Sequence, residues 1–160
     1  HTGISGKTRV GYEGDSFVRI LEDFLGFSRV DGAFLVGAGS LGSALLQDKG
    51  LSAFGLQIEA AFDTDKTKIG TKVNDIEIFH IDQFRAMAAE RKVVIGIITV
   101  PAEHAQNVAD LMVAWGIKAI WNFTPARIKV PTHIVVQNTT IYMNLAILFN
   151  KLYNDKGEKK

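Results

Sequence analysis

Hydrophobic and polar positions follow two periodicities that alternate along the chain. Short apolar runs predict strands at residues 32–36, 56–63, 76–80, 93–99, 119–123 and 134–138. Segments with helical spacing lie between them and predict helices at 41–49, at 82–90 with Asp82 as the cap, and at 101–114 with Pro101 in the first turn. The alternation predicts an α/β fold with a doubly wound parallel sheet and right-handed crossovers.

The same pattern divides the chain into four segments. Residues 1–14 are polar and rich in glycine, which predicts a linker. A helix follows at 15–25, with Asp15 as its cap, and opens a domain that we expect to extend over 15–140. Residues 141–153 predict a C-terminal helix, and 154–160 predict a polar tail.

The C-terminal helix is apolar almost all round. One stripe consists of Ile141, Leu145, Leu148 and Leu152, and a second of Tyr142, Ala146, Phe149 and Tyr153. A helix of this kind must be buried on nearly every side. It lies either in the core of the monomer or in the interface of a homodimer, exchanged between subunits, and we favour the dimer.

Composition excludes several classes of protein. The chain has 160 residues, 47% hydrophobic, which is enough to bury a core. It has no cysteine, so a disulfide framework, a cysteine nucleophile and a thiolate metal site are excluded. The net charge of +1 gives no bulk attraction to nucleic acid. No apolar run is long enough to span a membrane, and we expect a cytoplasmic protein.

A glycine-rich loop follows the first strand, in the sequence "VGAGSLGSALL". Gly37 allows a tight turn, Gly39 lets a pyrophosphate approach the backbone, and Gly42 lets the helix pack on the strand. Ala38, Ser40 and Leu41 complete the loop. This strand–turn–helix context predicts a dinucleotide site in a Rossmann-type domain, although such a turn can also serve packing alone.

An acidic residue, Asp63, ends the second strand. A carboxylate there can accept hydrogen bonds from the adenosine ribose and would repel a 2′-phosphate. No arginine follows it closely, so the sequence favours NAD or NADH over NADP. Asp63 is otherwise an ordinary turn residue.

Catalytic residues are not apparent. His1, His80, His104 and His133 are interpreted as terminal, turn or surface residues, and no metal-binding motif is present. Little sequence remains after the sheet to form a substrate domain. We therefore expect no catalytic site and no metal site: the chain binds a cofactor that it does not consume.

The motifs "RVGY", "AAFDTDKTKIG", "TVPAEHAQ" and "GIKAIWNFTPAR", together with the glycine loop, are similar to those of the Rex family of redox-sensing transcriptional repressors. The resemblance extends from about Arg9 to Tyr153. It implies a homodimer with an N-terminal winged-helix domain, a nucleotide domain and an exchanged last helix. It also implies a sensor of the NADH/NAD⁺ ratio that leaves its operator DNA when NADH binds.

The resemblance also implies a set of cofactor contacts. Residues 37–42 would hold the pyrophosphate, and Asp63 would hold the ribose. The remaining contacts would come from two loops at the carboxyl ends of strands and from the linker, namely Thr99, Val100, Pro101, Asn122, Phe123 and Tyr12.

The chain differs from the family in two respects. The winged helix is missing from these residues, so we expect operator binding only through that missing domain. Thr140 stands where many members have an aspartate before the last helix. Two alternative functions remain. One is the nucleotide domain of an NAD-dependent dehydrogenase or a CoA-ligase-like enzyme, and the other is a dimerisation module with a structural nucleotide.

Overall fold

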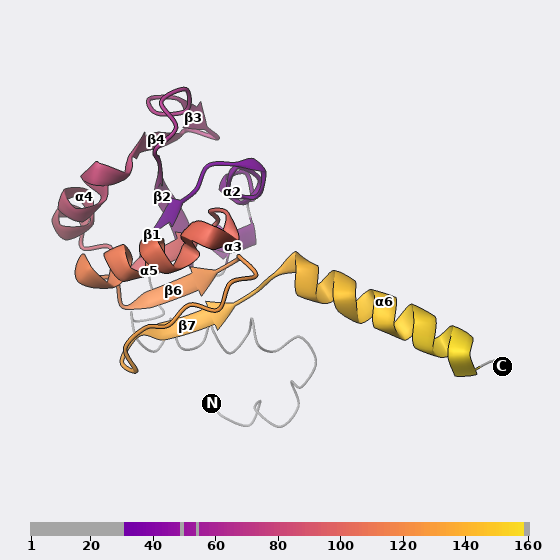
Figure 1. The fold of residues 1–160 in the computed structure, drawn as a ribbon. Coiled ribbons are helices and arrows are strands. Elements are labelled where there is room, and N and C mark those ends of the chain that lie inside the picture. The colour runs from indigo at the N-terminus through magenta and orange to yellow at the C-terminus, as the bar shows by residue number, and fades with distance from the viewer. Residues whose placement is uncertain (1–30, 49, 54, 159–160) are drawn as a thin grey trace.

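The computed structural model describes residues 31–48, 50–53 and 55–158, so the linker, Tyr12 and the helix predicted at 15–25 lie outside it (Figure 1). Its strands are β1 (Asp31–Val36), β2 (Leu56–Asp63), β3 (Lys72–Val73), β4 (Ile76–His80), β5 (Ile95–Ile98), β6 (Ala119–Asn122) and β7 (Val135–Asn138). Its α-helices are α2 (Ser40–Leu46), α3 (Gly50–Ala53), α4 (Phe84–Arg91), α5 (Ala105–Ala114) and α6 (Ile141–Glu158).

The strands form one sheet in the order β3-β4-β2-β1-β5-β6-β7. All neighbouring pairs are parallel except β3 with β4. The chain winds outward from β1 to β2 and β4, then returns to β5 on the other side of β1 and continues to β7. This is the predicted doubly wound sheet, and its switch point lies between β1 and β5.

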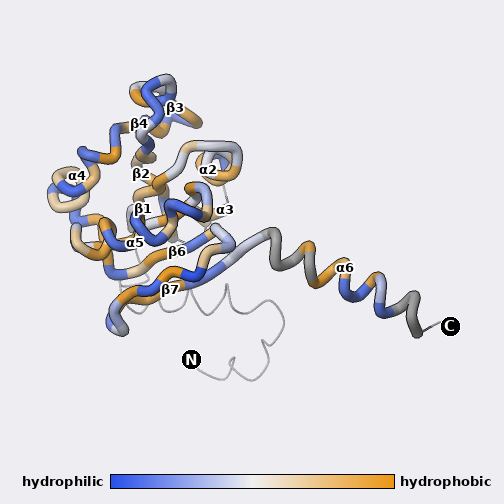
Figure 2. The backbone as a smooth tube through the Cα atoms, viewed as in Figure 1, coloured by the Kyte–Doolittle hydropathy of each residue, from blue (hydrophilic) through white to orange (hydrophobic). Residues whose placement is uncertain are grey.

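Two apolar layers hold the helices to the sheet. On one face, Phe34 and Phe62 pack with Phe84 of α4, with ring centroids 4.9–5.3 Å apart, and α5 extends this layer. On the other face, Leu35 and Ile58 belong to a layer that includes residues of α2 and α3. The buried strands are accordingly the hydrophobic centre of the backbone trace (Figure 2).

Strand β2 carries an extra residue relative to β1. Ala33 pairs with Ile58, but Phe34 pairs with Ala60, so Glu59 is bulged out of the register. Ile58 faces the layer of α2 and α3, whereas Ala60 and Phe62 both face the layer of α4 and α5. The bulge therefore changes which residues of β2 point to each face.

Several element boundaries differ from the prediction. The helix predicted at 41–49 ends at Leu46, and the short α3 follows it. The helix predicted at 82–90 begins with a 3₁₀ turn at Ile81–Gln83, and the cap is the side chain of His80 rather than Asp82. Helix α5 is likewise preceded by a 3₁₀ turn, Ala102–His104.

Strand β4 was predicted with its observed bounds, but β3 and the hairpin that joins the two strands were not. Its two-residue turn places Asn74 and Asp75 at φ +51° and +65°. These are the left-handed conformations of a type I′ hairpin turn, which asparagine and aspartate tolerate well.

Helix α6 extends away from the sheet domain (Figure 1). Six of its apolar side chains are exposed by 45–63%: Leu145, Ile147, Leu148, Phe149, Leu152 and Tyr153. They are therefore not buried in the core of this chain. The helix also continues to Glu158, so the tail predicted at 154–160 is helical over 154–158. No helix within the described residues is long and apolar enough to cross a membrane.

Candidate functional site

The glycine loop leaves β1 at the switch point of the sheet. The Gly37 N–H donates to the Phe62 carbonyl (2.8 Å), and Gly37 has φ +107°, a conformation that favours glycine. A Cβ there would lie 2.7 Å from the Thr99 backbone. The turn therefore needs glycine both for its conformation and for its close approach to β5.

Gly42 and Gly39 have different roles. A Cβ at Gly42 would overlap the Gly37 carbonyl oxygen, so glycine is required for α2 to pack against the turn. A Cβ at Gly39 would meet no described protein atom within 4 Å, and its φ of −79° is accessible to any residue. Packing of the chain therefore does not demand glycine at 39. Open space over an accessible backbone fits the close approach of a pyrophosphate.

Asp63 joins the end of β2 to the glycine loop. Its Oδ2 accepts the Ala38 N–H (2.8 Å), and its Oδ1 accepts the N–H groups of Thr64 (2.7 Å) and Asp65 (3.0 Å). Each carboxylate oxygen has two acceptor sites, so Oδ1 is filled and Oδ2 keeps one. Asp63 is only partly buried. It can therefore accept one further hydrogen bond, as a ribose hydroxyl would supply.

Thr99 supports the loop from the end of β5. Its hydroxyl can donate to the carbonyl oxygen of Gly37 (2.7 Å) or to that of Val36 (3.1 Å). Its N–H donates to the same Val36 carbonyl oxygen (2.9 Å). Val100 is half-buried and Pro101 is exposed at the same edge. The structure thus brings this predicted loop next to the glycine loop, with the Thr99 side chain bonded to the turn itself.

Asn122 lies in a buried polar network at the ends of β6 and β7. Its Nδ2 donates to Ala126 O (2.9 Å) and Asn138 Oδ1 (3.0 Å), while its Oδ1 accepts the N–H (3.0 Å) and hydroxyl (2.8 Å) of Thr124. These bonds use the full capacity of the amide, and the residue is 0% exposed. Asn122 therefore shapes the loop that follows β6. Phe123, which is half-buried, stacks on Trp121 with ring centroids 4.8 Å apart.

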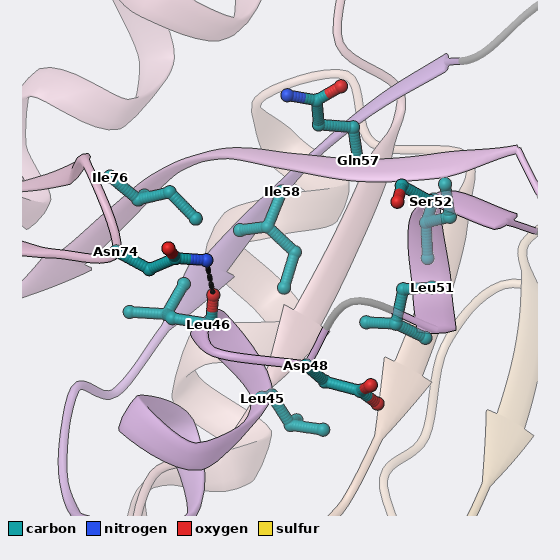
Figure 3. A pocket seen from close by; sticks show the side chains of 10 residues that line it. Leu45, Leu46, Asp48, Leu51, Ser52, Gln57, Ile58, Asn74 and Ile76 are labelled. Carbon is teal, nitrogen blue, oxygen red and sulfur yellow. Dashed lines mark hydrogen bonds between the residues drawn. The ribbon is translucent and has the colours of Figure 1, made fainter.

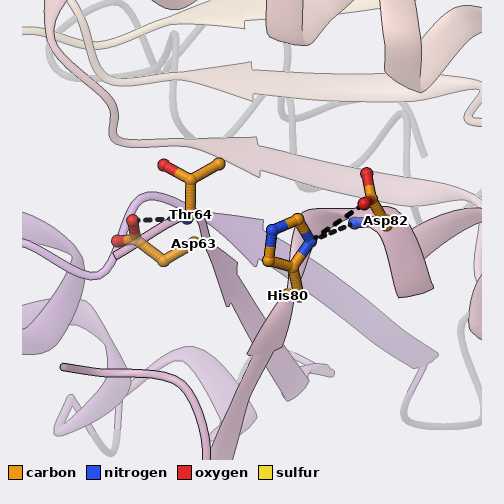
Figure 4. A network of polar contacts seen from close by, with 4 residues as sticks. All are labelled: Asp63, Thr64, His80 and Asp82. Atoms are coloured by element: carbon orange, nitrogen blue, oxygen red, sulfur yellow. Dashed lines mark hydrogen bonds and ion pairs between the residues drawn. The ribbon is translucent and has the colours of Figure 1, made fainter. Parts of the chain in front are cut away.

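His80 lies at the carboxyl edge of the sheet, at the end of β4. Asp63 and His80 are register partners at the ends of β2 and β4, and the His80 Nδ1 accepts the Asp82 N–H (3.0 Å; Figure 4). The sequence placed His80 at the end of the third predicted strand, on the adenine side of the sheet, and the residue was interpreted as a surface or turn histidine; its role as a cap was not predicted. The parallel pairing of two strand ends was the signal that could have placed His80 beside Asp63.

Other groups on this edge are loop-forming. Hydrogen bonds from the hydroxyl and the N–H of Thr67 lower the pKa of the exposed Asp65 carboxyl below its ordinary value of 3.8. Within the described part of the chain, no group of three or more histidine, aspartate or glutamate side chains is placed to hold a metal ion.

A cavity of about 200 Å³ lies elsewhere, between α2, α3, the start of β2 and the hairpin turn (Figure 3). Apolar side chains such as Leu45, Leu51 and Ile58 line it, and Asn74 donates across it to the Leu46 carbonyl (3.2 Å). None of the predicted cofactor residues lines this cavity. The candidate site is therefore the carboxyl edge of the sheet, not the cavity.

The fold and this edge define the protein as a doubly wound nucleotide-binding domain, with a glycine loop at the switch point and an acid at the end of the second parallel strand. The family model of the CoA binding domain matches residues 31–126. A redox-sensing transcriptional repressor Rex from Bacteroides fragilis is 58% identical over 152 residues, which cover 95% of this chain and 69% of that protein. The chain therefore belongs to the Rex family of redox-sensing transcriptional repressors.

Solved structures agree with this assignment. The crystal structure of RSP in complex with β-NAD⁺ and operator DNA has a TM-score of 0.79 and 30% identity, over 91% of this chain and 67% of that one. The complex of RSP with β-NADH has a TM-score of 0.77 and 30% identity, over 91% and 70% of the two chains. RSP is a Rex-family repressor. The similarity to RSP confirms the fold class that was predicted from the sequence.

Proposed function

We propose that this chain is the NADH- and NAD⁺-sensing domain of a Rex repressor, and that it binds the dinucleotide along the carboxyl edge of its sheet. The observation that carries the proposal is the Ala38 N–H to Asp63 Oδ2 hydrogen bond (2.8 Å). It ties the acid that would hold the adenosine ribose to the loop that would hold the pyrophosphate. One carboxylate acceptor site is left for the ligand.

The remaining predicted contact residues have two kinds of role in this proposal: some position the loops, and others contact the cofactor. Thr99 and Asn122 act by positioning, because their side chains are hydrogen-bonded to the Gly37 turn and to the loop after β6. Val100, Pro101 and Phe123 are exposed or half-buried, and they are the side chains we assign to the nicotinamide half. Tyr12 lies outside the described residues, and its contact remains a prediction.

The dimer is the second part of the proposal. Among the described side chains, seven large hydrophobic ones are exposed, and all but Leu111 lie on α6. Leu148 is 58% exposed, so a partner that covers it removes apolar surface from water, whereas the core residues are already buried. A second copy of this chain, with its own α6, supplies a matching apolar surface.

Discrimination between the two cofactors follows from charge. The nicotinamide ring of NAD⁺ is positive and that of NADH is neutral. An apolar subunit boundary beside the ring penalises the charged form by desolvation. A tenfold preference for NADH needs only about 1.4 kcal/mol. NADH then favours the closed dimer by this differential affinity alone.

We also propose a regulator rather than an enzyme. The matched relatives are named as repressors, and the histidines of the described edge have structural partners or are exposed. Operator DNA binding is assigned to a part of the repressor outside these 160 residues. In keeping with the net charge of +1, we expect this chain alone to bind operator duplex no better than random duplex.

Calorimetric titration of the chain with NADH, NAD⁺, NADPH and CoA tests the proposal. NADH should bind more tightly than NAD⁺, and NADPH and CoA should bind weakly because their adenosine phosphates meet Asp63 or its surroundings. Equal affinity for NADH and NAD⁺ would refute the sensor. Tighter binding of CoA than of NADH would favour the CoA-ligase-like alternative. Steady oxidation of NADH with a carbonyl substrate would favour the dehydrogenase.

A further inference from the structure

His80 occupies a fixed place next to Asp63. It is the last residue of β4, and in the parallel pairing of β2 with β4 its register partner is Asp63. The side chain caps the 3₁₀ turn that follows, through the hydrogen bond from the Asp82 N–H to Nδ1. The side chain is still 40% exposed. The ring is thus held at one nitrogen and open at the carboxyl edge of the sheet.

This cap decides which nitrogen carries the proton. A backbone N–H can only donate, so Nδ1 must be the acceptor, and the ring hydrogen of the neutral imidazole lies on Nε2. The Asp82 carboxylate is 3.4 Å from the same Nδ1, but that side chain is 86% exposed and is solvated. The shorter bond to the main chain, at 3.0 Å, therefore sets the tautomer. Figure 4 shows the Nε2 edge of the ring on the side of Asp63 and Thr64.

The topology indicates which part of a dinucleotide would reach this edge. A pyrophosphate on the glycine loop lies at the switch point, and a ribose on Asp63 lies at the end of β2. The next strand outward is β4, which ends at His80. The group beyond the ribose is the adenine base, whose ring nitrogens are hydrogen-bond acceptors.

We propose that His80 is a specificity contact for the adenine base, donating from Nε2–H to a ring nitrogen of the purine. This inference rests on the proposed function, because it places the base by way of Asp63 and the glycine loop. It assigns to His80 two simultaneous bonds: Nδ1 accepts from the Asp82 N–H, and Nε2 donates to the ligand. The cap fixes the ring, so the donor is oriented before the ligand arrives.

The substitution His80→Asn separates the two bonds. The Asn oxygen can still cap the turn, since asparagine is among the best capping residues, but the short side chain withdraws the Nε2–H donor. We expect the thermal unfolding midpoint to stay near that of the parent chain. NADH and ADP-ribose should each bind about fivefold to tenfold more weakly, as expected for one lost hydrogen bond. The ratio of NADH to NAD⁺ affinity should not change, because both share the adenosine half.

Asp82→Asn is the matched control, because it removes the neighbouring charge and keeps the N–H that orients His80. It should bind NADH and ADP-ribose as the parent chain does. Parent-like affinity of His80→Asn for both ligands would overturn the proposal. A changed NADH to NAD⁺ ratio would overturn it too, since it would place His80 at the nicotinamide. If Asp63→Ala weakens NADH while His80→Asn does not, only the adenine contact fails. If the parent chain binds neither ligand, the proposed function itself fails.

Discussion

The substitution Asp63→Ala tests whether one carboxylate serves both the protein and the ligand. In the protein, it removes the acceptor for three N–H groups at 2.7–3.0 Å. The loss of an acceptor costs most at the Ala38 N–H, because Ala38 is only 3% exposed and water cannot replace the bond. Leaving a buried donor unsatisfied costs about 1–3 kcal/mol of folding free energy. We therefore expect a measurably lower free energy of unfolding in urea.

In the complex, the same substitution removes the remaining acceptor site on Oδ2. A hydrogen bond to a charged group, partly exposed to solvent, predicts a loss of about 1–3 kcal/mol in NADH affinity, or about fivefold to 150-fold. Calorimetry on the parent chain and on the variant measures this loss. The urea titration keeps the folding effect separate from the binding effect, provided that both proteins are folded at the temperature of the assay.

A thermodynamic cycle then distinguishes direct contact from an effect through the loop. The second perturbation is an NADH analogue that lacks the adenosine 2′-hydroxyl. If Asp63 holds that hydroxyl, the analogue should lose affinity for the parent chain but little more for Asp63→Ala, so the two losses are not additive. Fully additive losses would show that Asp63 acts only by shaping the glycine loop. That result would refute the ribose contact.

Four further substitutions have expected outcomes. Gly42→Ala should lower the free energy of unfolding by about 1–3 kcal/mol through overpacking. Gly39→Ala should unfold as the parent chain does, but it should lose most of its NADH affinity in calorimetry. Equal losses of stability in the two variants would contradict these roles. Leu148→Glu should give monomers in sedimentation where the parent chain is dimeric, because it buries a charge in the proposed interface, and a stable dimer would refute that interface. Thr67→Ala should raise the pKa of Asp65 toward 3.8 in an NMR titration, since it removes the hydroxyl that stabilises the carboxylate, and an unchanged pKa would contradict that cause.

The lowered pKa of Asp65 makes the free energy of unfolding depend on pH. Its pKa is lowered in the folded chain, so the stabilisation is present above its ordinary pKa of 3.8 and is lost as the pH falls through the lower folded value. The residue is fully exposed, and the contribution is local to the turn that follows β2.

Local patterns in the sequence were sufficient to predict the parallel strands of the sheet, but not β3. Strand β2 was predicted with its observed bounds, because apolar residues run from Leu56 to an acid at Asp63. The turn after β1 was predicted for the same kind of reason, since Gly37, Gly39 and Gly42 follow directly on the first apolar strand. The hairpin turn was missed although its signal, Asn74-Asp75, was present.

Features that depend on strands meeting in space were not predictable from local patterns. The bond between Asn122 and Asn138 requires β6 to pair with β7 in one register, so the support that Asn122 gives to the loop after β6 was not predicted; its contact with a cofactor stays a prediction. The cap of the turn after β4 was assigned to Asp82 because aspartate is a favoured cap. The structure gives it to His80, whose Nδ1 accepts the N–H of Asp82.

The bulge at Glu59 determines which change of length this strand can accept. Deleting that single residue would leave Ile58 paired with Ala33 and Ala60 paired with Phe34, so every side chain from Ala60 to Asp63 would keep its face. Phe62 would stay in the aromatic layer, and Asp63 would still face the loop to which it is bonded. Deleting Ala60 would instead bring Glu59 opposite Phe34 and place its carboxylate in the apolar layer of α4 and α5. Descendants of the sequence are therefore expected to tolerate the loss of residue 59 but not the loss of its neighbour.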